Sequence, residues 1–150
     1  MNAGPAKRAH LPAILDLLEA AQLPTSGVEA ILPHLLVIEE NGVLVGVGGL
    51  EPHGDDALIR SVVVAAAQRG RGVASTLCDA LESAAARSGA RALYLLTDTA
   101  AGFFARRGYR KIARTDAPAA IRASEEFASL CGPTAVPMTL VLVAEKTGQG

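Results

Sequence analysis

Three scarcities limit what this chain can be. Its two cysteines fit a reducing compartment and exclude a small fold held together by disulfides. Every purely apolar run is far shorter than the ~20 residues that a membrane-spanning helix needs. The first residues also lack the basic and then apolar pattern of a signal peptide, so we expect a cytoplasmic protein that does not bind a membrane.

Charge of one sign is scarce as well. The formal net charge is −1 at pH 7, and the charged residues are scattered along the chain. The close pairs Arg69 with Arg71 and Arg106 with Arg107 are local, so nucleic acid is not an expected partner. The length fits one domain, residues 1–150, and a domain of this size buries roughly 70% of the surface of its unfolded chain, enough for a core.

Hydrophobic spacing predicts alternating helices and strands. Pro12 and the leucines after it predict a helix over 11–22, and Asn41-Gly42 predicts a tight hairpin. A strand over 91–97 is expected to pair in parallel with a strand over 57–64, because a helix connects them. The other expected elements are a short, weakly supported strand near 5–8, strands over 34–40, 43–50, 109–114 and 135–143, and helices over 27–32, 73–87, 99–107 and 118–130.

The most informative motif is the glycine-rich, basic segment Arg69-Gly70-Arg71-Gly72-Val73-Ala74, which opens the helix over 73–87. The first N–H groups of a helix lack partners and lie at the positive end of its dipole, so such a loop can hold phosphate. A P-loop would need a lysine, and a dinucleotide fingerprint would need a third glycine, where Ser75 follows instead. Taken alone, the segment also fits an ordinary tight turn.

The spacing Arg69-x-x-Gly72-x-Ala74 resembles the pyrophosphate loop of the GCN5-related N-acetyltransferases (GNAT). A second segment, Thr97 to Tyr109, resembles the family's Asn-x-x-Ala-x-x-Phe-Tyr-x-Lys-x-Gly-Phe motif through Ala100, Phe103 and Gly108. The order of the expected elements is also that of this family. The resemblance implies an α/β (α+β) acyl-CoA N-acyltransferase fold, with a mixed central sheet whose strands splay apart, flanked by helices.

A narrower resemblance concerns the arsenic-resistance (ArsN-type) branch of these N-acetyltransferases. It rests on Leu11 to Ile14, Gly49 to Glu51 and, above all, the run from Pro118 to Cys131. The tail of that branch usually carries a second cysteine, and Pro137 stands at its place here. An arsenic site built on a cysteine pair is therefore not expected, and neither is a metal ion.

The resemblance implies acetyl-CoA as cofactor, bound largely by main chain. The strand Val62, Val63 and Val64 would hold the pantetheine arm, with the Val64 N–H polarising the thioester carbonyl; the valines also suit a plain buried strand. Phe103 and Phe104 would flank the pantetheine. Arg106 would reach a phosphate, unless it only complements the end of its helix. The pyrophosphate cradle would consist of Arg69, Gly70, Arg71, Gly72, Val73, Ala74 and Ser75.

Isolated polar residues are the candidates for the site that binds the acceptor amine. Glu51, at the end of a strand, is the first candidate for the general base, through a water, or else a solvated carboxylate; His53 is the second. Arg60 interrupts an apolar strand, so it either faces a cleft and binds a substrate carboxylate or is paired internally. Phe104 replaces the family's tyrosine acid; Tyr109 or Cys78 could substitute, although a thiolate of pKa ~8 to 9 can leave unprotonated.

These residues predict an acetyl-CoA-dependent N-acetyltransferase acting on a small-molecule amine, either an amino acid or an amino-acid-like arsenical. The alternative is a CoA-binding or ligand-sensing module with little turnover, and a third hypothesis is a thiol-based arsenic binder using Cys78 and Cys131. The segment over 118–143 is expected to form one wall of the acceptor pocket through Arg122 and to contribute to a homodimer, unless it only completes the core of a monomer.

Overall fold

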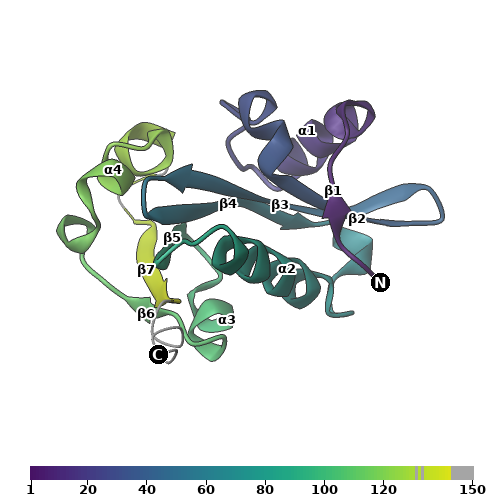
Figure 1. The fold of residues 1–150 in the computed structure, drawn as a ribbon. Coiled ribbons are helices and arrows are strands. Elements are labelled where there is room, and N and C mark those ends of the chain that lie inside the picture. Colours follow the sequence, from purple (N-terminus) through teal and green to yellow (C-terminus); the bar gives the residue numbers. More distant parts are fainter. Residues whose placement is uncertain (131, 133, 143–150) are drawn as a thin grey trace. The chain divides into compact units, whose positions relative to one another are not determined.

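The computed structural model describes residues 1–130, 132 and 134–142. Over these residues, seven strands are hydrogen-bonded in the order β1-β2-β3-β4-β5-β7-β6, with helices between them along the chain (Figure 1). The sheet contains both parallel and antiparallel pairs, which confirms the predicted fold class. The chain forms two compact units, Met1–Glu51 with Ile59–Ala84 and Pro52–Leu58 with Ala85–Gly150. The single domain stays a prediction, and the units are described in turn.

The first unit contains the N-terminal helices and the first strands. Its strands β1 and β2 are antiparallel, as are β2 and β3. Asn41 and Gly42 both have positive φ, 54° and 77°, which confirms the predicted hairpin of type I′. Its elements are β1 (Gly4–Pro5), α1 (Leu11–Ala20), the 3₁₀ helix η2 (Glu29–His34), β2 (Leu35–Glu40), β3 (Val43–His53), most of β4 (Asp56–Val64) and most of α2 (Val73–Arg87).

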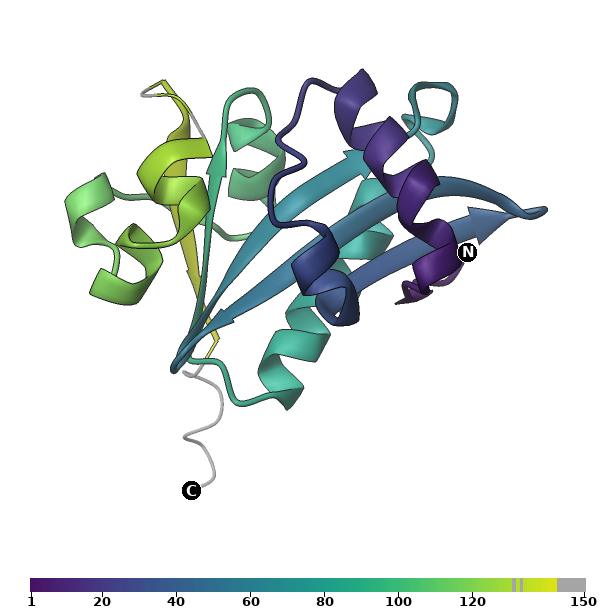
Figure 2. The same ribbon diagram turned by 90° about the horizontal axis from the view of Figure 1, so that it is seen from above.

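In this unit α1 and η2 cover one face of β2 to β4, and α2 covers the other (Figures 1 and 2). A cluster that includes Ile14, Leu18 and Val47 fills the α1 face. On the α2 face, a Cβ at Gly46 would lie 2.8 Å from Val73 Cγ1, and one at Gly48 would lie 2.9 Å from Leu81 Cδ1. The two glycines therefore let α2 pack closely against β3, which fixes where the helix begins.

The second unit is built around β5 (Ala92–Thr97). Residues Asp56–Leu58 of β4 pair with it in parallel, as predicted, and β7 (Val136–Val141) pairs antiparallel on its other edge. Leu58, Ile121 and Phe127 are buried together in its core. The unit also contains α3 (Ala101–Arg106), β6 (Arg110–Lys111), α4 (Ala119–Arg122) and a π-helical turn at Glu126–Leu130.

Two elements of this unit are much shorter than predicted, and α3 and β7 differ from their predicted bounds by smaller amounts. The strand expected over 109–114 is reduced to β6, because the chain enters a 3₁₀ turn at Arg114 that is closed by a hydrogen bond from Ala113 N to Asp116 Oδ2 (3.2 Å). The helix expected over 118–130 breaks at Ser124. Its hydroxyl donates to Ile121 O (2.6 Å) and accepts from Phe127 N (3.3 Å), so a side chain replaces the helical backbone bonds.

Of the other predicted boundaries, Val143 lies outside the described residues, and the first strand is limited to Gly4–Pro5. Within the part of the chain that the structure describes, no helix is long and apolar enough to cross a membrane.

Candidate functional site

The glycine-rich loop has the geometry of an anion cradle. Gly70 and Gly72 have φ of 82° and 85°, a region that glycine adopts without strain, and a Cβ at either position would meet nothing within 4 Å. The first hydrogen bond of α2 runs from Thr76 N to Gly72 O (3.0 Å). The N–H groups of Val73 to Ser75 therefore precede the helical bonds and lie at the positive end of the helix dipole, as phosphate binding requires.

The two arginines of this loop differ. Arg71 Nη1 and Nη2 donate to the Glu40 carboxylate at 2.9 and 3.2 Å, and Arg71 also donates to the Gln68 side chain. The hydrogen bond from Arg71 holds the pKa of Glu40 below its usual range and raises the pKa of Arg71 in turn. Arg69 is exposed, and no ion pair found among the described residues involves it.

The end of β4 offers main-chain donors along one edge. Ala65 N donates to Val45 O (2.8 Å), so by alternation the N–H of Val63 also faces β3, and those of Val62 and Val64 face the opposite edge. Over the described residues, pairing on that edge is limited to Asp56–Leu58. Ser61, at φ 61°, interrupts the regular strand before the valines. This edge can therefore pair with an extended ligand arm.

The candidate base and the candidate carboxylate clamp contact each other. Arg60, 4% exposed, lies with Nη1 3.6 Å from Glu51 Oε1. Its Nη2 donates to Ser26 O (2.9 Å) and its Nε to Ser61 Oγ (3.1 Å). Of the two interpretations of Arg60, internal pairing fits this geometry. The Glu51 side chain keeps 20% of its surface exposed, although its Oε1, which faces Arg60, is itself buried.

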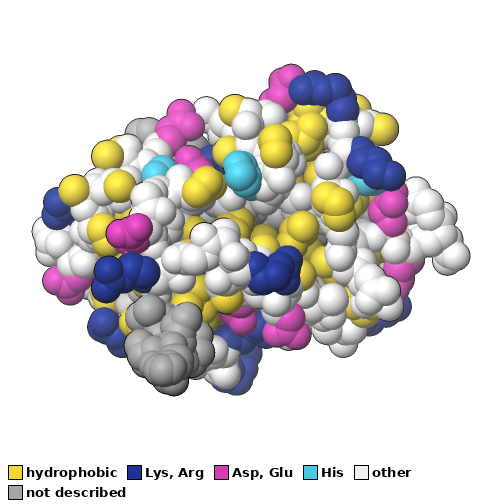
Figure 3. Space-filling model, viewed as in Figure 1, with side chains coloured by type: hydrophobic (Ala, Val, Ile, Leu, Met, Phe, Trp, Pro, Cys, Tyr) yellow, Lys and Arg dark blue, Asp and Glu magenta, His cyan; other side chains and the backbone are white. Residues whose placement is uncertain are grey.

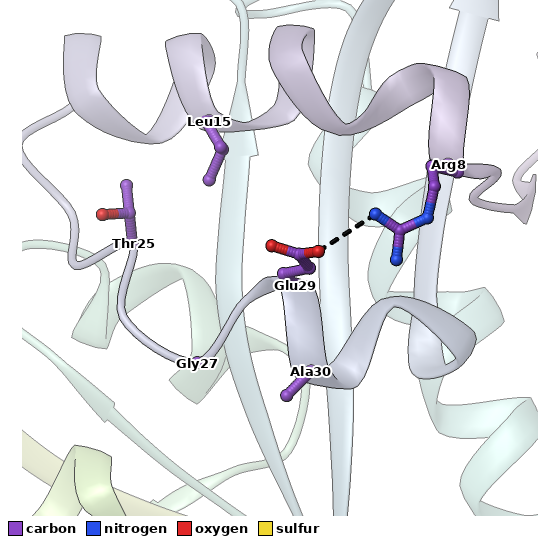
Figure 4. Close-up of a pocket in the computed structure, with 6 residues that line it drawn as sticks. All are labelled: Arg8, Leu15, Thr25, Gly27, Glu29 and Ala30. Atoms are coloured by element: carbon purple, nitrogen blue, oxygen red, sulfur yellow. Dashed lines mark hydrogen bonds and ion pairs between the residues drawn. The ribbon is translucent and has the colours of Figure 1, made fainter.

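A surface pocket of about 650 Å³ lies between α1 and the Thr25–Ala30 segment (Figure 4). On it, Arg8 and Glu29 form an ion pair of 3.0 Å that is well exposed to solvent. The same segment carries Ser26, whose carbonyl binds Arg60, so the pocket wall is connected to the Glu51–Arg60 pair. The lining residues are Arg8, Leu15, Thr25, Gly27, Glu29 and Ala30.

In the second unit the predicted aromatic pair is part of a small cluster. Phe104 is 6% exposed and makes edge-to-face contacts with Phe103 (ring centroids 5.0 Å apart) and Tyr109 (5.3 Å). Arg107, not Arg106, lies over the Phe103 ring, 5.9 Å from its centroid. Arg106 is exposed in the last turn of α3, where either interpretation of its role is open.

The structure also places Arg122 and the cysteines. Arg122 is exposed, and its Nη1 lies 3.5 Å from Thr115 O. Cys78 is buried with 0% exposure, while Cys131 lies outside the described residues. Opposite charges are interspersed on the face of the molecule seen in Figure 3. Sequence reasoning missed four residues of this region: Arg8, Ser26, Glu29 and Glu40. Each contacts a segment that is distant in the sequence, and no local motif indicates such a contact.

A family model described as the acetyltransferase (GNAT) domain matches residues 32–111. The chain belongs to this family. Thus the predicted enzyme class, an acyltransferase, is confirmed, and with it acetyl-CoA as the cofactor. The loop with its open glycines, and the main-chain edge at Val62 and Val64, fit that cofactor. The arsenic-resistance branch is not tested by the family match and stays a prediction.

Solved structures of acetyltransferases share the fold. Rv2747 from Mycobacterium tuberculosis, in complex with CoA, is 25% identical, with 95% of this chain and 99% of that chain covered and a TM-score of 0.81. N-acetylglutamate synthase from Neisseria gonorrhoeae, complexed with coenzyme A and N-acetyl-glutamate, is 19% identical over 94% of this chain and 35% of its own length (TM-score 0.82). An aminoglycoside 6′-N-acetyltransferase complexed with coenzyme A is 18% identical, over 94% and 97% (TM-score 0.71). None of the curated proteins compared with the chain matches it.

Proposed function

We propose that this GNAT enzyme acetylates the amine of a small molecule that also carries a carboxylate. The observation that carries the proposal is the pocket on the first unit, whose volume is in the range of small-molecule sites. Arg8 and Glu29 present opposite charges to it, which suits a zwitterion. The neighbouring fold of N-acetylglutamate synthase, complexed with N-acetyl-glutamate, supports an amino-acid-like acceptor.

Residues of this chain can support the transfer at three points: the thioester carbonyl, the attacking amine and the pyrophosphate. Acetyl-CoA, when bound, supplies the acetyl group, and its sulfur leaves as the thiolate. With acetyl-CoA bound, the Val64 N–H would be the donor to the thioester carbonyl oxygen. Glu51 accepts a proton from the attacking amine through a water. Val73 to Ser75 bind the pyrophosphate by main chain, with Arg69 nearby as a cation.

Arg60 is a positioning residue in this proposal. It joins Glu51 to the carbonyl of Ser26 on the pocket wall, so it orients the base and the acceptor segment together. The Arg60 guanidinium is buried and internally bonded, whereas the ion pair of Arg8 with Glu29 is exposed to solvent, so an acceptor carboxylate can take the place of Glu29 beside Arg8. In the second unit, Phe103, Phe104 and Arg106 toward CoA, and Arg122 toward the acceptor, remain proposals from the family motif and the sequence.

One observation favours a second candidate, a CoA-binding or ligand-sensing module with little turnover. Phe104, at the place of the family's tyrosine, is packed against Tyr109 and has no proton to donate. Under this alternative CoA would bind normally, but no amine would be acetylated. The homodimer also stays a prediction, and light scattering coupled to size exclusion tests it, because a monomer at micromolar concentration contradicts it.

The test is release of the CoA thiol from acetyl-CoA in the presence of paired amines, each amino acid beside its carboxamide. We expect turnover with the acids and weaker turnover with the amides. In Arg8→Ala the KM should rise for the acids alone, with Arg122→Ala as the comparison. Equal activity on acids and amides would remove the carboxylate from the proposal, and CoA binding without release would favour the sensing module. An amino-acid-like arsenical belongs in the panel, because the ArsN-type resemblance predicts it as an acceptor.

A further inference from the structure

Glu40 and Arg71 form an ion pair with two hydrogen bonds beside the phosphate loop. The two guanidinium nitrogens of Arg71 each meet one Glu40 oxygen, at 2.9 and 3.2 Å, in the two-pronged geometry that makes arginine–carboxylate pairs specific. Glu40 is the last residue of β2 and pairs with Val43 across the hairpin. Arg71 stands between Gly70 and Gly72, so the contact ties the middle of the loop to a strand.

The loop needs such a tie. Gly70 and Gly72 both adopt positive φ and have open space around them, and glycine loses more backbone entropy on ordering than other residues. The Gln68 side chain, at the start of the loop, also accepts from Arg71. Arg71 thus connects two anchors outside the pair of glycines and limits the freedom between them.

The charges decide between two roles for Arg71. A lone carboxylate beside a pyrophosphate site would repel the ligand, and Arg71 cancels that charge by pairing with it. If Arg71 instead left Glu40 to bind phosphate, Glu40 would be a competitor of the cofactor. The bidentate contact and the bond to Gln68 use three of the five N–H donors of the Arg71 guanidinium, whereas Arg69 has no ion pair within the described residues.

We propose that Glu40 is a positioning residue that holds Arg71, and through it the loop, ready for the pyrophosphate of CoA, while Arg69 supplies the cation that meets the phosphates. This rests on the proposed function only in taking CoA as the ligand. The two roles for Arg71 give opposite signs: removing Glu40 weakens CoA binding if the pair orders the loop, and strengthens it if Glu40 competes.

Calorimetric titration with CoA measures whether removal of Glu40 weakens or strengthens CoA binding. Glu40→Gln should weaken binding about threefold, the size of effect that a partly exposed ion pair supports. Arg71→Ala should weaken it further, because it leaves Glu40 uncompensated beside the phosphates. The double variant Glu40→Gln/Arg71→Ala should then recover part of that loss. Tighter binding by Glu40→Gln, or a double variant equal to Arg71→Ala, would overturn the proposal.

Two control variants separate the effect of loop order on CoA binding from the effect of side-chain charge. Glu39→Gln removes the neighbouring carboxylate, which pairs with His10 at 3.2 Å, and should leave CoA affinity unchanged. Arg69→Ala should weaken CoA binding and reduce its salt dependence, and this loss should add to that of Glu40→Gln.

A second readout needs no cofactor. NMR relaxation of the ligand-free protein should show lower order parameters for the amides of Gly70 and Gly72 in Glu40→Gln and Arg71→Ala than in the wild type, and no change in Arg69→Ala. Unchanged order in Glu40→Gln would refute the positioning role even if affinity fell. Absence of CoA binding in the wild type, with the loop loosened as expected, would instead refute the proposed function and leave the positioning role intact.

Discussion

The phosphate loop and the Glu51–Arg60 network belong to one unit but are built from different parts of the chain. The loop presents main-chain N–H groups, placed by two glycines at positive φ and by the start of α2. The network presents side chains, and it joins β3, β4 and the Thr25–Gly27 segment through a buried guanidinium. A main-chain site depends on backbone shape, whereas a side-chain network depends on charge and hydrogen-bonding partners.

This difference predicts different responses to mutation. In the loop, a change of side chain should matter where it alters φ, fills the open space around Gly70 and Gly72, or removes one of the two arginine charges. In the network, even a substitution that conserves shape should matter, because it leaves a partner without its charge. Three substitutions test the contrast, and a fourth, outside both regions, provides the background.

Glu51→Gln should have the largest effect. It conserves shape but removes the proton acceptor, so turnover should fall about 100-fold, at the lower end of what general bases contribute. Affinity for CoA should remain near that of the wild type, since the loop does not use this side chain. Stopped-flow turnover across pH 6 to 9 and CoA titration measure the two quantities. Wild-type turnover over this range would place the base elsewhere, and lost CoA affinity would break the contrast.

Arg60→Met should act first on stability. The side chain keeps its length but leaves Glu51 and the Ser26 carbonyl without the guanidinium, so unfolding free energy should fall by about 2 to 3 kcal/mol. Urea denaturation measures the loss. The double variant with Glu51→Gln should recover part of it, and Arg8→Met, in an exposed pair, should cost less than about 1 kcal/mol. A loss no larger than that of Arg8→Met would mean that the buried network contributes little.

The same contrast explains what could be read from the sequence. The loop was predictable because its geometry depends on neighbours in the chain: two glycines, then a helix start. The contacts of Arg60 and Arg71 were not, since they reach a carbonyl 34 positions away and a carboxylate 31 positions away. Spacing patterns carry no information about such pairs. The break of the helix at Ser124 could not be predicted for the same reason. Whether the Ser124 side chain replaces the helical bonds depends on how Ile121 and Phe127 are buried in the core.

Gly72→Val should act mainly on cofactor binding, with a smaller cost in stability from backbone strain. A β-branched residue at φ 85° is strained, and its side chain would enter the open space in front of the loop. Affinity for CoA should fall at least tenfold, about 1.4 kcal/mol. Gly89→Val, also at positive φ (87°) with nothing within 4 Å of a Cβ, is the matched control and should bind CoA normally. Unchanged affinity in calorimetry would remove the loop as the pyrophosphate site.

Asp56→Asn should have the smallest effect and lies outside both regions, in the strand segment of the second unit. Burial raises the pKa of Asp56 above its ordinary value of 3.8, and the charge of Asp55 adds to the rise. A raised pKa in the folded state means that the native protein binds the proton more tightly than the unfolded chain, so this group favours folding at low pH and opposes it once the pH exceeds the folded pKa.

Asparagine at position 56 carries no charge to desolvate. The variant should therefore be slightly more stable than the wild type at pH 7, by about 0.5 kcal/mol or less for a site this exposed, and the advantage should shrink as the pH falls toward 3.8. Thermal unfolding at a series of pH values measures it. Because turnover and CoA affinity should not change, this variant gives the background against which Glu51→Gln and Gly72→Val are compared, and an advantage that grew toward low pH would reverse the sign assigned to Asp56.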